Sequence, residues 1–254
     1  MYEYDFALEL AKEAGKIISE NFRTALSSVE WKGKADLVTN VDKYIDGLVR
    51  ERILKAFPSY GIVTEEADEL NSTAHKRFII DPLDGTTNFV KSYPQVAVSI
   101  AFENDGKITF GVVYNPILDE LFIGEIGKGA TLNGKPISVT KTDNLESALI
   151  ATGFVYKARN EKMVKSFNDI LGNILSIRCD GSAALDLAHV AQGIFDGYYQ
   201  KGIHIWDIAA GSLIVQEAKG RVSDFSNGDE YLSKGEIFAS NGLIHDSIIK
   251  YLNI

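Results

Sequence analysis

The chain reads RFIIDPLDGTTNF over residues 77–89, and this stretch indicates how the rest of the fold is built. Its apolar beginning is typical of a buried strand, and we expect the strand to end at Asp81 because proline cannot continue a ladder of hydrogen bonds. Leu83 then has a free carbonyl in the turn, and Asp84 lies close enough to Asp81 for both carboxylates to grip one or two ions. Gly85 permits a close backbone approach, and Thr86 begins a predicted helix whose free N–H groups suit an anion. The spacing D-x-x-D alone could be a turn in which the aspartates only cap a helix. The whole string is more specific and favours a site for a metal-bridged phosphate.

Helices are predicted before this stretch and a β-meander after it. Apolar residues at three-to-four spacing indicate an amphipathic helix over residues 2–26. A second helix is expected from Thr39, with Asp42 completing a capping arrangement. Residues 95–137 alternate β-branched runs with the turn dipeptides DG (105–106), NP (115–116) and NG (133–134), which is typical of an antiparallel meander.

Strands and helices alternate in the second part of the chain, from about residue 144. We expect a strand at ALIAT, helices over 161–172 and 182–192, another helix after Trp206, and strands at RVSDF and EIFASN. The predicted class is therefore α+β with two packed halves. Residues 1–143 form an N-terminal α+β half with the metal-binding motifs, and residues 144–254 form an α/β half that completes the active site.

The composition narrows the class of protein and of partner. The chain has 254 residues, of which 45% are hydrophobic and 24% charged, as in ordinary globular proteins. With 35 acidic and 26 basic residues the net charge is −9, which argues against nucleic-acid binding. The lack of a long apolar run or a basic leader predicts a cytoplasmic protein without a membrane partner. The single Cys179 excludes an internal disulfide and is expected in the core, so any metal site should use carboxylates, which suit Mg²⁺.

Three further acidic positions are candidates for the same site. Of the adjacent pair in GIVTEE (61–66), only Glu65 is expected to join it, since neighbouring residues at a strand end point apart. Asp207 opens the apolar helix of WDIAAG (206–211), and Asp42 lies in DLVTNVD (36–42). Helix capping alone would account for Asp42 or Asp207.

These motifs together resemble the inositol monophosphatase family of Mg²⁺-dependent, lithium-sensitive sugar phosphatases. The resemblance covers most of the chain and rests on DLVTNVD (36–42), TEE (64–66, where the family often has GEE), DPLDGTTNF (81–89) and GIHIWDIAAG (202–211). It implies a layered αβαβα sandwich of the sugar phosphatase type, with the active site between the halves. It also implies a homodimer, with a tetramer as the alternative.

The resemblance assigns metal ligands residue by residue. Glu65, Asp81 and the Leu83 carbonyl correspond to ligands of a first Mg²⁺. Asp81, Asp84 and Asp207 correspond to ligands of a second, with Asp81 bridging the two. A weaker third ion sits near Glu65 in such enzymes, so two to three Mg²⁺ per subunit are expected.

It also assigns catalytic and substrate-binding roles. Thr86, supported by Asp42, would act with Glu65 to orient and deprotonate the attacking water. The residues that would meet the substrate are Asp84, Gly85, Thr86, Ser182, Ala183, Gln200 and Asp207. Lys32 falls near the family's lysine-bearing loop. Arg159 and Arg178 could meet a distal phosphate, and a surface or structural charge explains either equally well, whereas His204 is expected to be structural.

One departure concerns the substrate. Inositol-directed members commonly have glutamate where this chain has Gln200, and glutamine keeps an acceptor but removes the charge. This weakens strict inositol selectivity and would suit a second phosphate better.

The function expected from these residues is Mg²⁺-dependent hydrolysis of a sugar or polyol phosphate monoester by a metal-activated water. A chain of charge −9 would repel a phosphate dianion unless cations intervened. No Cys, Ser or His nucleophile has an evident partner base, which favours direct attack by water. Inositol 1-phosphate is the first substrate expected, and fructose 1,6-bisphosphatase activity, alone or dual, is the alternative. Histidinol phosphatase and a non-catalytic metal-binding partner protein are more distant, the latter because no metal carboxylate is missing.

Overall fold

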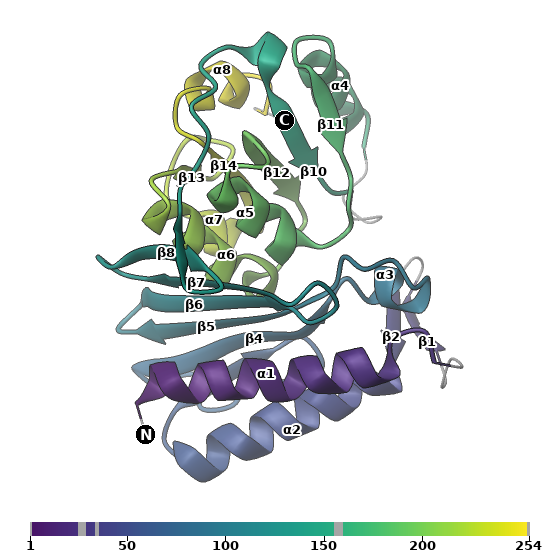
Figure 1. Ribbon diagram of the computed structural model, residues 1–254, viewed down its shortest axis with the longest axis vertical. Coiled ribbons are helices and arrows are strands. Elements are labelled where there is room, and N and C mark those ends of the chain that lie inside the picture. The colour runs from purple at the N-terminus through teal and green to yellow at the C-terminus, as the bar shows by residue number, and fades with distance from the viewer. Residues whose placement is uncertain (1, 25–28, 34–35, 155–159, 253–254) are drawn as a thin grey trace.

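The chain folds into five stacked layers (Figure 1). The computed structural model describes residues 2–24, 29–33, 36–154 and 160–252. Two long helices cover one face of a seven-stranded sheet, two further helices lie between this sheet and a five-stranded one, and another pair covers the far face of the five-stranded sheet. The layered αβαβα sandwich implied by the resemblance is confirmed.

The outer layer consists of α1 (Glu3–Asn21) and α2 (Asn40–Ala56). An antiparallel ribbon of β1 (Val29–Gly33) and β2 (Asp36–Thr39) lies between them in sequence. The capping box predicted at the start of α2 is present. The Thr39 backbone N–H donates to Asp42 Oδ2 at 2.9 Å, and Thr39 Oγ1 accepts from the backbone N–H groups of Val41 and Asp42.

The seven-stranded sheet contains the predicted meander, and its strand order is β3-β4-β5-β6-β7-β8-β9. Its first two strands run parallel and each later neighbour is antiparallel. The strands are β3 (Gly61–Thr64), β4 (Lys76–Asp84), β5 (Ala97–Asn104), β6 (Lys107–Asn115), β7 (Glu120–Glu125), β8 (Gly129–Leu132) and β9 (Lys135–Ile137). Along β4, Phe78 and Ile80 pack on the core beneath α1 and α2, whereas Ile79 packs on the middle layer. Both faces of the sheet are therefore buried.

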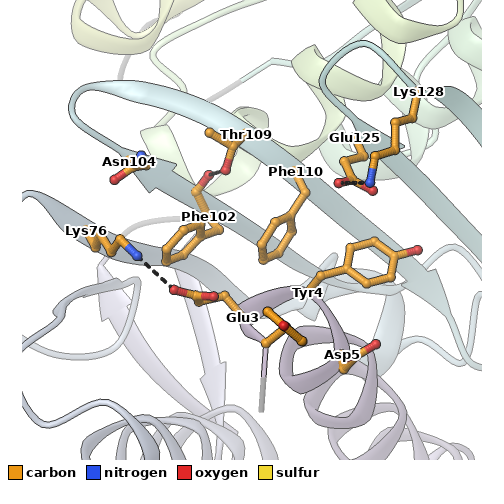
Figure 2. A pocket seen from close by; sticks show the side chains of 11 residues that line it. Glu3, Tyr4, Asp5, Lys76, Phe102, Asn104, Thr109, Phe110, Glu125 and Lys128 are labelled. Atoms are coloured by element: carbon orange, nitrogen blue, oxygen red, sulfur yellow. Dashed lines mark hydrogen bonds and ion pairs between the residues drawn. The ribbon is translucent and has the colours of Figure 1, made fainter.

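Aromatic rings fill the face of this sheet that α1 covers (Figure 2). Phe102 and Phe110 stack with their ring centroids 5.2 Å apart. A pocket of about 490 Å³ opens beside them at the start of α1, and both of its lysines are ion-paired with glutamates. This pocket lies on the opposite face of the sheet from the acidic residues described below.

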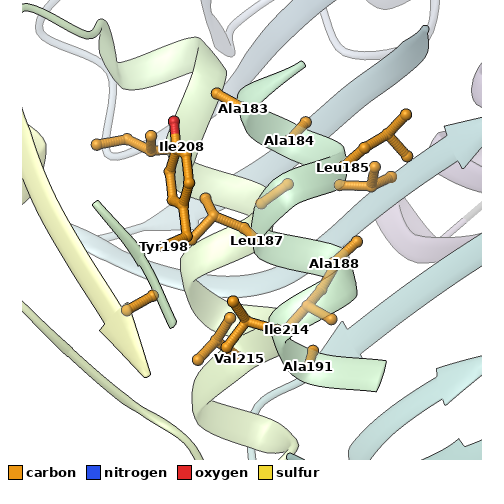
Figure 3. Packing of buried hydrophobic residues seen from close by; sticks show 14 of the residues in the cluster. Ala183, Ala184, Leu185, Leu187, Ala188, Ala191, Tyr198, Ile208, Ile214 and Val215 are labelled. Carbon is orange, nitrogen blue, oxygen red and sulfur yellow. The ribbon is translucent and has the colours of Figure 1, made fainter. Parts of the chain in front are cut away.

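Small residues allow the middle layer to approach closely. It consists of α5 (Ala183–Gln192) and α6 (Ile205–Glu217), and the alanines of α5 pack on apolar side chains of α6 (Figure 3). On the sheet side, a Cβ added at Gly111 would lie 2.6 Å from the carbonyl oxygen of Ala210. The absence of a side chain there lets the α6 backbone rest directly on β6.

The five-stranded sheet has the order β11-β10-β12-β14-β13. Its central strand β12 pairs in parallel with β10 and antiparallel with β14. The strands are β10 (Leu149–Thr152), β11 (Ser176–Arg178), β12 (Gly197–Lys201), β13 (Arg221–Ser223) and β14 (Glu236–Ser240). The helical segments that accompany this sheet outside the middle layer are a 3₁₀ turn (Leu145–Ser147), α4 (Glu161–Leu171), α7 (Tyr231–Lys234) and α8 (His245–Ile249). The far face of the sheet packs on α4 and α8. The division into halves at residues 143 and 144 stays a prediction.

The strand that leads to the acidic motif does not end at Asp81, so that expectation is wrong. Asp81 pairs with Ser99 and Asp84 with Ala97, so three steps along β4 match two along β5. Pro82 therefore sits in a β-bulge, where a missing N–H is tolerated. In a regular strand residues three apart face opposite sides, and the bulge returns Asp84 to the side of Asp81. The short helix α3 (Thr86–Val90) follows, as predicted.

Two further expectations have clear outcomes. Cys179 is exposed, so its predicted core position is wrong. It directly follows β11, the short strand at the edge of the sheet, so no neighbouring strand packs beyond it. Among the described helices, none combines the length and apolarity needed to cross a bilayer.

Candidate active site

Three aspartates predicted as metal ligands come together at the edge of the middle layer. Asp81 and Asp84 lie on the bulged end of β4, and Asp207 lies in the first turn of α6. One carboxylate oxygen from each lies within 4.8 Å of the others. The two motifs are more than 120 residues apart in sequence, and α6 brings them together by packing on the sheet.

Each of these carboxylates has one oxygen held by a donor from the chain. The Leu83 backbone N–H donates to Asp81 Oδ1 at 3.0 Å, and the His204 backbone N–H donates to Asp207 Oδ2 at 2.8 Å. Asp84 Oδ2 accepts from the backbone N–H of Ala184 at 2.8 Å. Such contacts orient carboxylates for a cation, and an all-oxygen donor set suits a hard ion such as Mg²⁺. The residues present therefore fit the expected metal.

The electrostatics of the cluster favour a bound cation. Burial, together with the negative charges of Glu65, Asp84 and Asp207, raises the pKa of Asp81 well above its usual range. Burial raises the pKa of Asp84 to about 6, against the lowering effect of its hydrogen bonds. The pKa of Asp207 is also raised, first by burial and then by the charge of Asp84. The chain thus concentrates negative charge where a divalent ion would offset it.

Glu65 reaches the cluster from the neighbouring strand. Thr64, the last residue of β3, pairs in parallel with Ile80, so Glu65 follows at the level of Asp81. Its negative charge contributes to the raised pKa values of both Asp81 and Asp207. The strand register therefore brings the Glu65 backbone level with Asp81, whereas the carboxylate oxygens that lie within 4.8 Å of one another are those of Asp81, Asp84 and Asp207.

Thr86 and Asp42 form the pair that the resemblance implied. Thr86 Oγ1 donates to Asp42 Oδ1 at 2.8 Å and lies 3.3 Å from the Leu83 carbonyl oxygen. The other oxygen of Asp42 accepts from the Thr39 backbone and hydroxyl. Asp42 therefore has two roles. It completes the capping box of Thr39 at the start of α2, and it anchors the Thr86 hydroxyl.

Gly85 turns the chain from β4 into α3. Its φ of +92° lies in the left-handed region, and an added Cβ would lie 2.7 Å from the Gln95 carbonyl oxygen. Only glycine fits this turn without displacing the backbone. The phosphate contact expected of the Gly85 and Thr86 N–H groups stays a prediction.

Ser182 and Ala183, which were predicted to contact the substrate at the start of α5, are buried in the structure. Ser182 is only 1% exposed, and its hydroxyl donates to Asp84 Oδ2 at 2.6 Å. Ala183 is also largely buried. The structure thus gives Ser182 a role in positioning Asp84, a role that sequence reasoning missed. Its position directly before an apolar helix was the available signal, because a capping hydroxyl at a helix start can also hold a neighbouring carboxylate.

Gln200 lies on β12 and contacts a residue that the sequence did not single out. The hydroxyl of Tyr198 donates to Gln200 Oε1 at 2.7 Å. Another residue missed is Asn88, whose side-chain amide donates to the carbonyl oxygens of Gln95 and Asp180, both at 2.8 Å. Asn88 thereby ties the start of α3 to the turn before α5.

The remaining predicted positions are Lys32, Arg159, Arg178 and His204. Arg159 and the side chain of Lys32 lie outside the described part of the chain. Arg178 is exposed and donates to Ser176 and to the Ile177 carbonyl. The His204 ring stacks on Trp206 with centroids 4.7 Å apart, in keeping with its expected structural role.

Comparison with known proteins identifies relatives over the whole chain. The model of the inositol monophosphatase family matches residues 2–254. Nus factor SuhB of Escherichia coli strain K12 is 42% identical over 244 residues, which are 93% of this chain and 90% of the relative. An inositol-1-monophosphatase of Rhizobium meliloti is 40% identical over 234 residues, 90% of this chain and 88% of that protein. The crystal structure of the extragenic suppressor protein suhB from Bartonella henselae is 38% identical and superposes with a TM-score of 0.94 over 98% of both chains.

Proposed function

The chain belongs to the inositol monophosphatase family, and from this premise we propose that it is a Mg²⁺-dependent phosphatase of sugar or polyol phosphate monoesters. The observation that carries this proposal is the cluster of Asp81, Asp84 and Asp207, each with one oxygen fixed by a donor from the chain. Inositol 1-phosphate is the first substrate proposed, because a relative at 40% identity is named an inositol-1-monophosphatase. Fructose 1,6-bisphosphate is the alternative, alone or as a second activity.

We propose that Asp81, Asp84 and Asp207, together with Glu65 and the Leu83 carbonyl, hold two to three Mg²⁺ ions. When bound, these ions would offset the charge of the phosphate and act as Lewis acids on its oxygens. The fixed carboxylates would hold them without rearrangement, because one oxygen of each aspartate is already anchored.

The chain itself would position the attacking water. The Thr86 hydroxyl donates its hydrogen bond to Asp42 Oδ1, so its lone pairs remain available to accept a hydrogen bond from water. We propose that Thr86 and Glu65 together orient this water and draw off its proton, as the resemblance implied. Asp42 is held by the α2 cap, which keeps Thr86 in one orientation.

A non-catalytic partner protein is the second candidate. The Escherichia coli relative is named a Nus factor, which does not name a phosphatase. What supports catalysis is that Asp81, Asp84 and Asp207, three of the four carboxylates assigned to metal binding, have oxygens within 4.8 Å of one another. We also propose that the chain forms a homodimer and is inhibited by lithium, as is expected of the family.

The test is phosphate release with and without Mg²⁺. The substrates are inositol 1-phosphate, fructose 1,6-bisphosphate, histidinol phosphate and 3′-phosphoadenosine 5′-phosphate. We expect Mg²⁺-dependent release from the first or second. Asp81→Asn should lower kcat/KM at least about a hundredfold because it removes the proposed bridging carboxylate.

The matched control is Asp143→Asn, which removes the same charge at an exposed position and should leave the rate unchanged. Undiminished turnover by Asp81→Asn would overturn the metal assignment. Mg²⁺ binding without release from any of the four substrates would favour the partner protein.

A further inference from the structure

A buried serine on β5 links the two layers that carry the acidic cluster. Ser99 is fully buried, and its hydroxyl donates to the Trp206 carbonyl oxygen at 3.2 Å. Within the sheet, Ser99 pairs directly with Asp81 on β4. On the helix, the Trp206 carbonyl and the Asp207 nitrogen belong to the same planar peptide group. One hydrogen bond thus connects the strand neighbour of Asp81 to the peptide group that leads into Asp207.

Glycines leave the middle of α6 in close but non-directional contact with the sheet. The helix packs on β5, β6 and β7 (Figure 1). Ala210 rests on Gly111, and Ile214 rests on Gly124, where an added Cβ would lie 2.9 Å from the Ile214 Cα. Apolar contacts of this kind bring the helix close to the sheet without defining a direction. Hydrogen bonds at the ends of α6 therefore have more influence on its angle.

The two ends of α6 are held by different hydrogen bonds. Glu217, its last residue, accepts from the backbone N–H groups of Gly127 and Gly129 at 3.0 and 2.8 Å. These contacts lie about three helical turns from Asp207. At the Asp207 end, the hydrogen bond to the sheet comes from Ser99. Without the Ser99 hydroxyl, α6 would stay anchored at its far end and be free to tilt where it carries Asp207.

A tilt of the helix would move the Asp207 carboxylate with it. Asp207 Oδ2 accepts from the His204 backbone N–H at 2.8 Å, so the side chain is tied to the first turn of its own helix. Its oxygens now come within 4.8 Å of an oxygen of Asp81. Mg²⁺ requires near-octahedral ligands at about 2.0–2.1 Å, whereas Ca²⁺ accepts about 2.3–2.6 Å and a more flexible geometry. The gap between the two carboxylates therefore decides which of these ions fits better.

We propose that Ser99 is a positioning residue for the metal site, which fixes the gap between Asp81 and Asp207 and thereby sets the size of the divalent cation that the site accepts. The inference rests on the metal assignment within the proposed function. Ser99 acts through the peptide group of Trp206 and Asp207, because its hydroxyl is bonded to that carbonyl. The chemical class of ligand concerned is a small, hard divalent cation.

The experiment measures the apparent Kd of Mg²⁺ and of Ca²⁺ by isothermal titration calorimetry of the metal-free protein. Ser99→Ala removes the hydroxyl and little volume. We expect its Kd for Mg²⁺ to rise about tenfold and its Kd for Ca²⁺ less than about threefold, because a wider gap suits the larger ion. The ratio of the two Kd values is taken within one variant, so a fraction of unfolded protein does not alter it.

Ser212→Ala is the matched control. Ser212 is 1% exposed, and its hydroxyl donates within α6 to the Ala209 carbonyl oxygen at 3.0 Å. Its removal should leave the ratio of Kd values unchanged. A second test repeats Ser99→Ala in an Asp207→Asn background. There it should change the Kd for Mg²⁺ less than about twofold, because the carboxylate through which Ser99 acts is gone.

The outcomes separate this inference from the metal assignment. If Ser99→Ala changes both Kd values by the same factor or changes neither, or if its full effect persists in the Asp207→Asn background, the inference is wrong and the metal assignment stands. If wild type binds no Mg²⁺, the metal assignment of the proposed function is wrong and the inference fails with it.

Discussion

The carboxylate of Asp84 depends on a residue that is distant in sequence. Ser182 donates to its Oδ2 at 2.6 Å, and the Ala184 backbone N–H donates to the same oxygen. Ser182 also caps α5 through its contact with Leu185. We expect Ser182→Ala to weaken Mg²⁺ binding about tenfold to a hundredfold, as losses of such supporting contacts do. Isothermal titration calorimetry with Mg²⁺ would measure the affinities of wild type and Ser182→Ala.

A loss of helix capping must be distinguished from a loss of metal support. Asn160 caps α4 by accepting from the Met163 backbone N–H at 3.0 Å, far from the acidic cluster. Asn160→Ala should therefore cost about 1 kcal/mol in the free energy of unfolding, as Ser182→Ala should through its cap, but leave Mg²⁺ affinity unchanged. Equal effects of both substitutions on Mg²⁺ affinity would contradict the support that we assign to Ser182.

Sequence reasoning succeeded for residues whose chemistry lies in a motif. Asp81, Asp84 and Asp207 were predicted together and lie together, because strings such as DPLDGTTNF combine residue type with spacing. Ser182 was predicted only as a substrate contact, and its hydrogen bond to Asp84 was missed. Tyr198 was not singled out at all. Tertiary packing decides which partner a hydroxyl finds, so the sequence alone does not reveal it. Cys179 was misplaced for a similar reason. The apolar residues around it lie on an edge strand that leaves the thiol exposed.

Among the elements, the helices and the meander were predicted well and the end of β4 was not. Periodicity shows where apolar faces recur, and turn dipeptides show where strands reverse. A proline, however, is compatible with either a strand end or a bulge, and only the pairing of Asp84 with Ala97 decides between them. That bulge places Asp81 and Asp84 on one face, so the unpredicted detail is the one that builds the site.

The contact between α6 and the sheet sets the position of Asp207. A Cβ at Gly111 would lie 2.6 Å from the carbonyl oxygen of Ala210 and 2.8 Å from its Cα, so the helix would have to move. We expect Gly111→Ala to lower the free energy of unfolding by about 1–3 kcal/mol and to weaken Mg²⁺ binding, because Asp207 is carried on α6. Urea denaturation and Mg²⁺ titration would measure the two effects.

Gly47 provides the opposite case within a helix. It is exposed on α2 and an added Cβ would meet nothing within 4 Å. Gly47→Ala should therefore stabilise the protein by about 0.5–1 kcal/mol and leave Mg²⁺ affinity unchanged. Destabilisation by both substitutions would show that the close approach at Gly111 is not the cause.

At the scale of the whole molecule, the proposed metal site joins distant parts of one chain. Asp81 and Asp84 extend from the seven-stranded sheet, whereas Asp207 is carried by the middle helical layer. The unfolded chain does not hold these carboxylates together, so Mg²⁺ should stabilise the fold by mass action. At a hundredfold excess over Kd the gain is about 2.7 kcal/mol, or roughly 5–10 °C in Tm for a chain of this size.

Thermal denaturation should be followed in Mg²⁺ and in a potassium salt of equal ionic strength, because the net charge of −9 also makes the fold sensitive to screening. Removal of Mg²⁺ with a chelator should reverse the rise in Tm. In Asp81→Asn, the specific rise should disappear while the effect of the potassium salt persists, since only the former needs the carboxylate cluster. An equal Mg²⁺-dependent rise in wild type and Asp81→Asn would mean that the ion stabilises the protein elsewhere, and that the buried acids of β4 and α6 do not form its site.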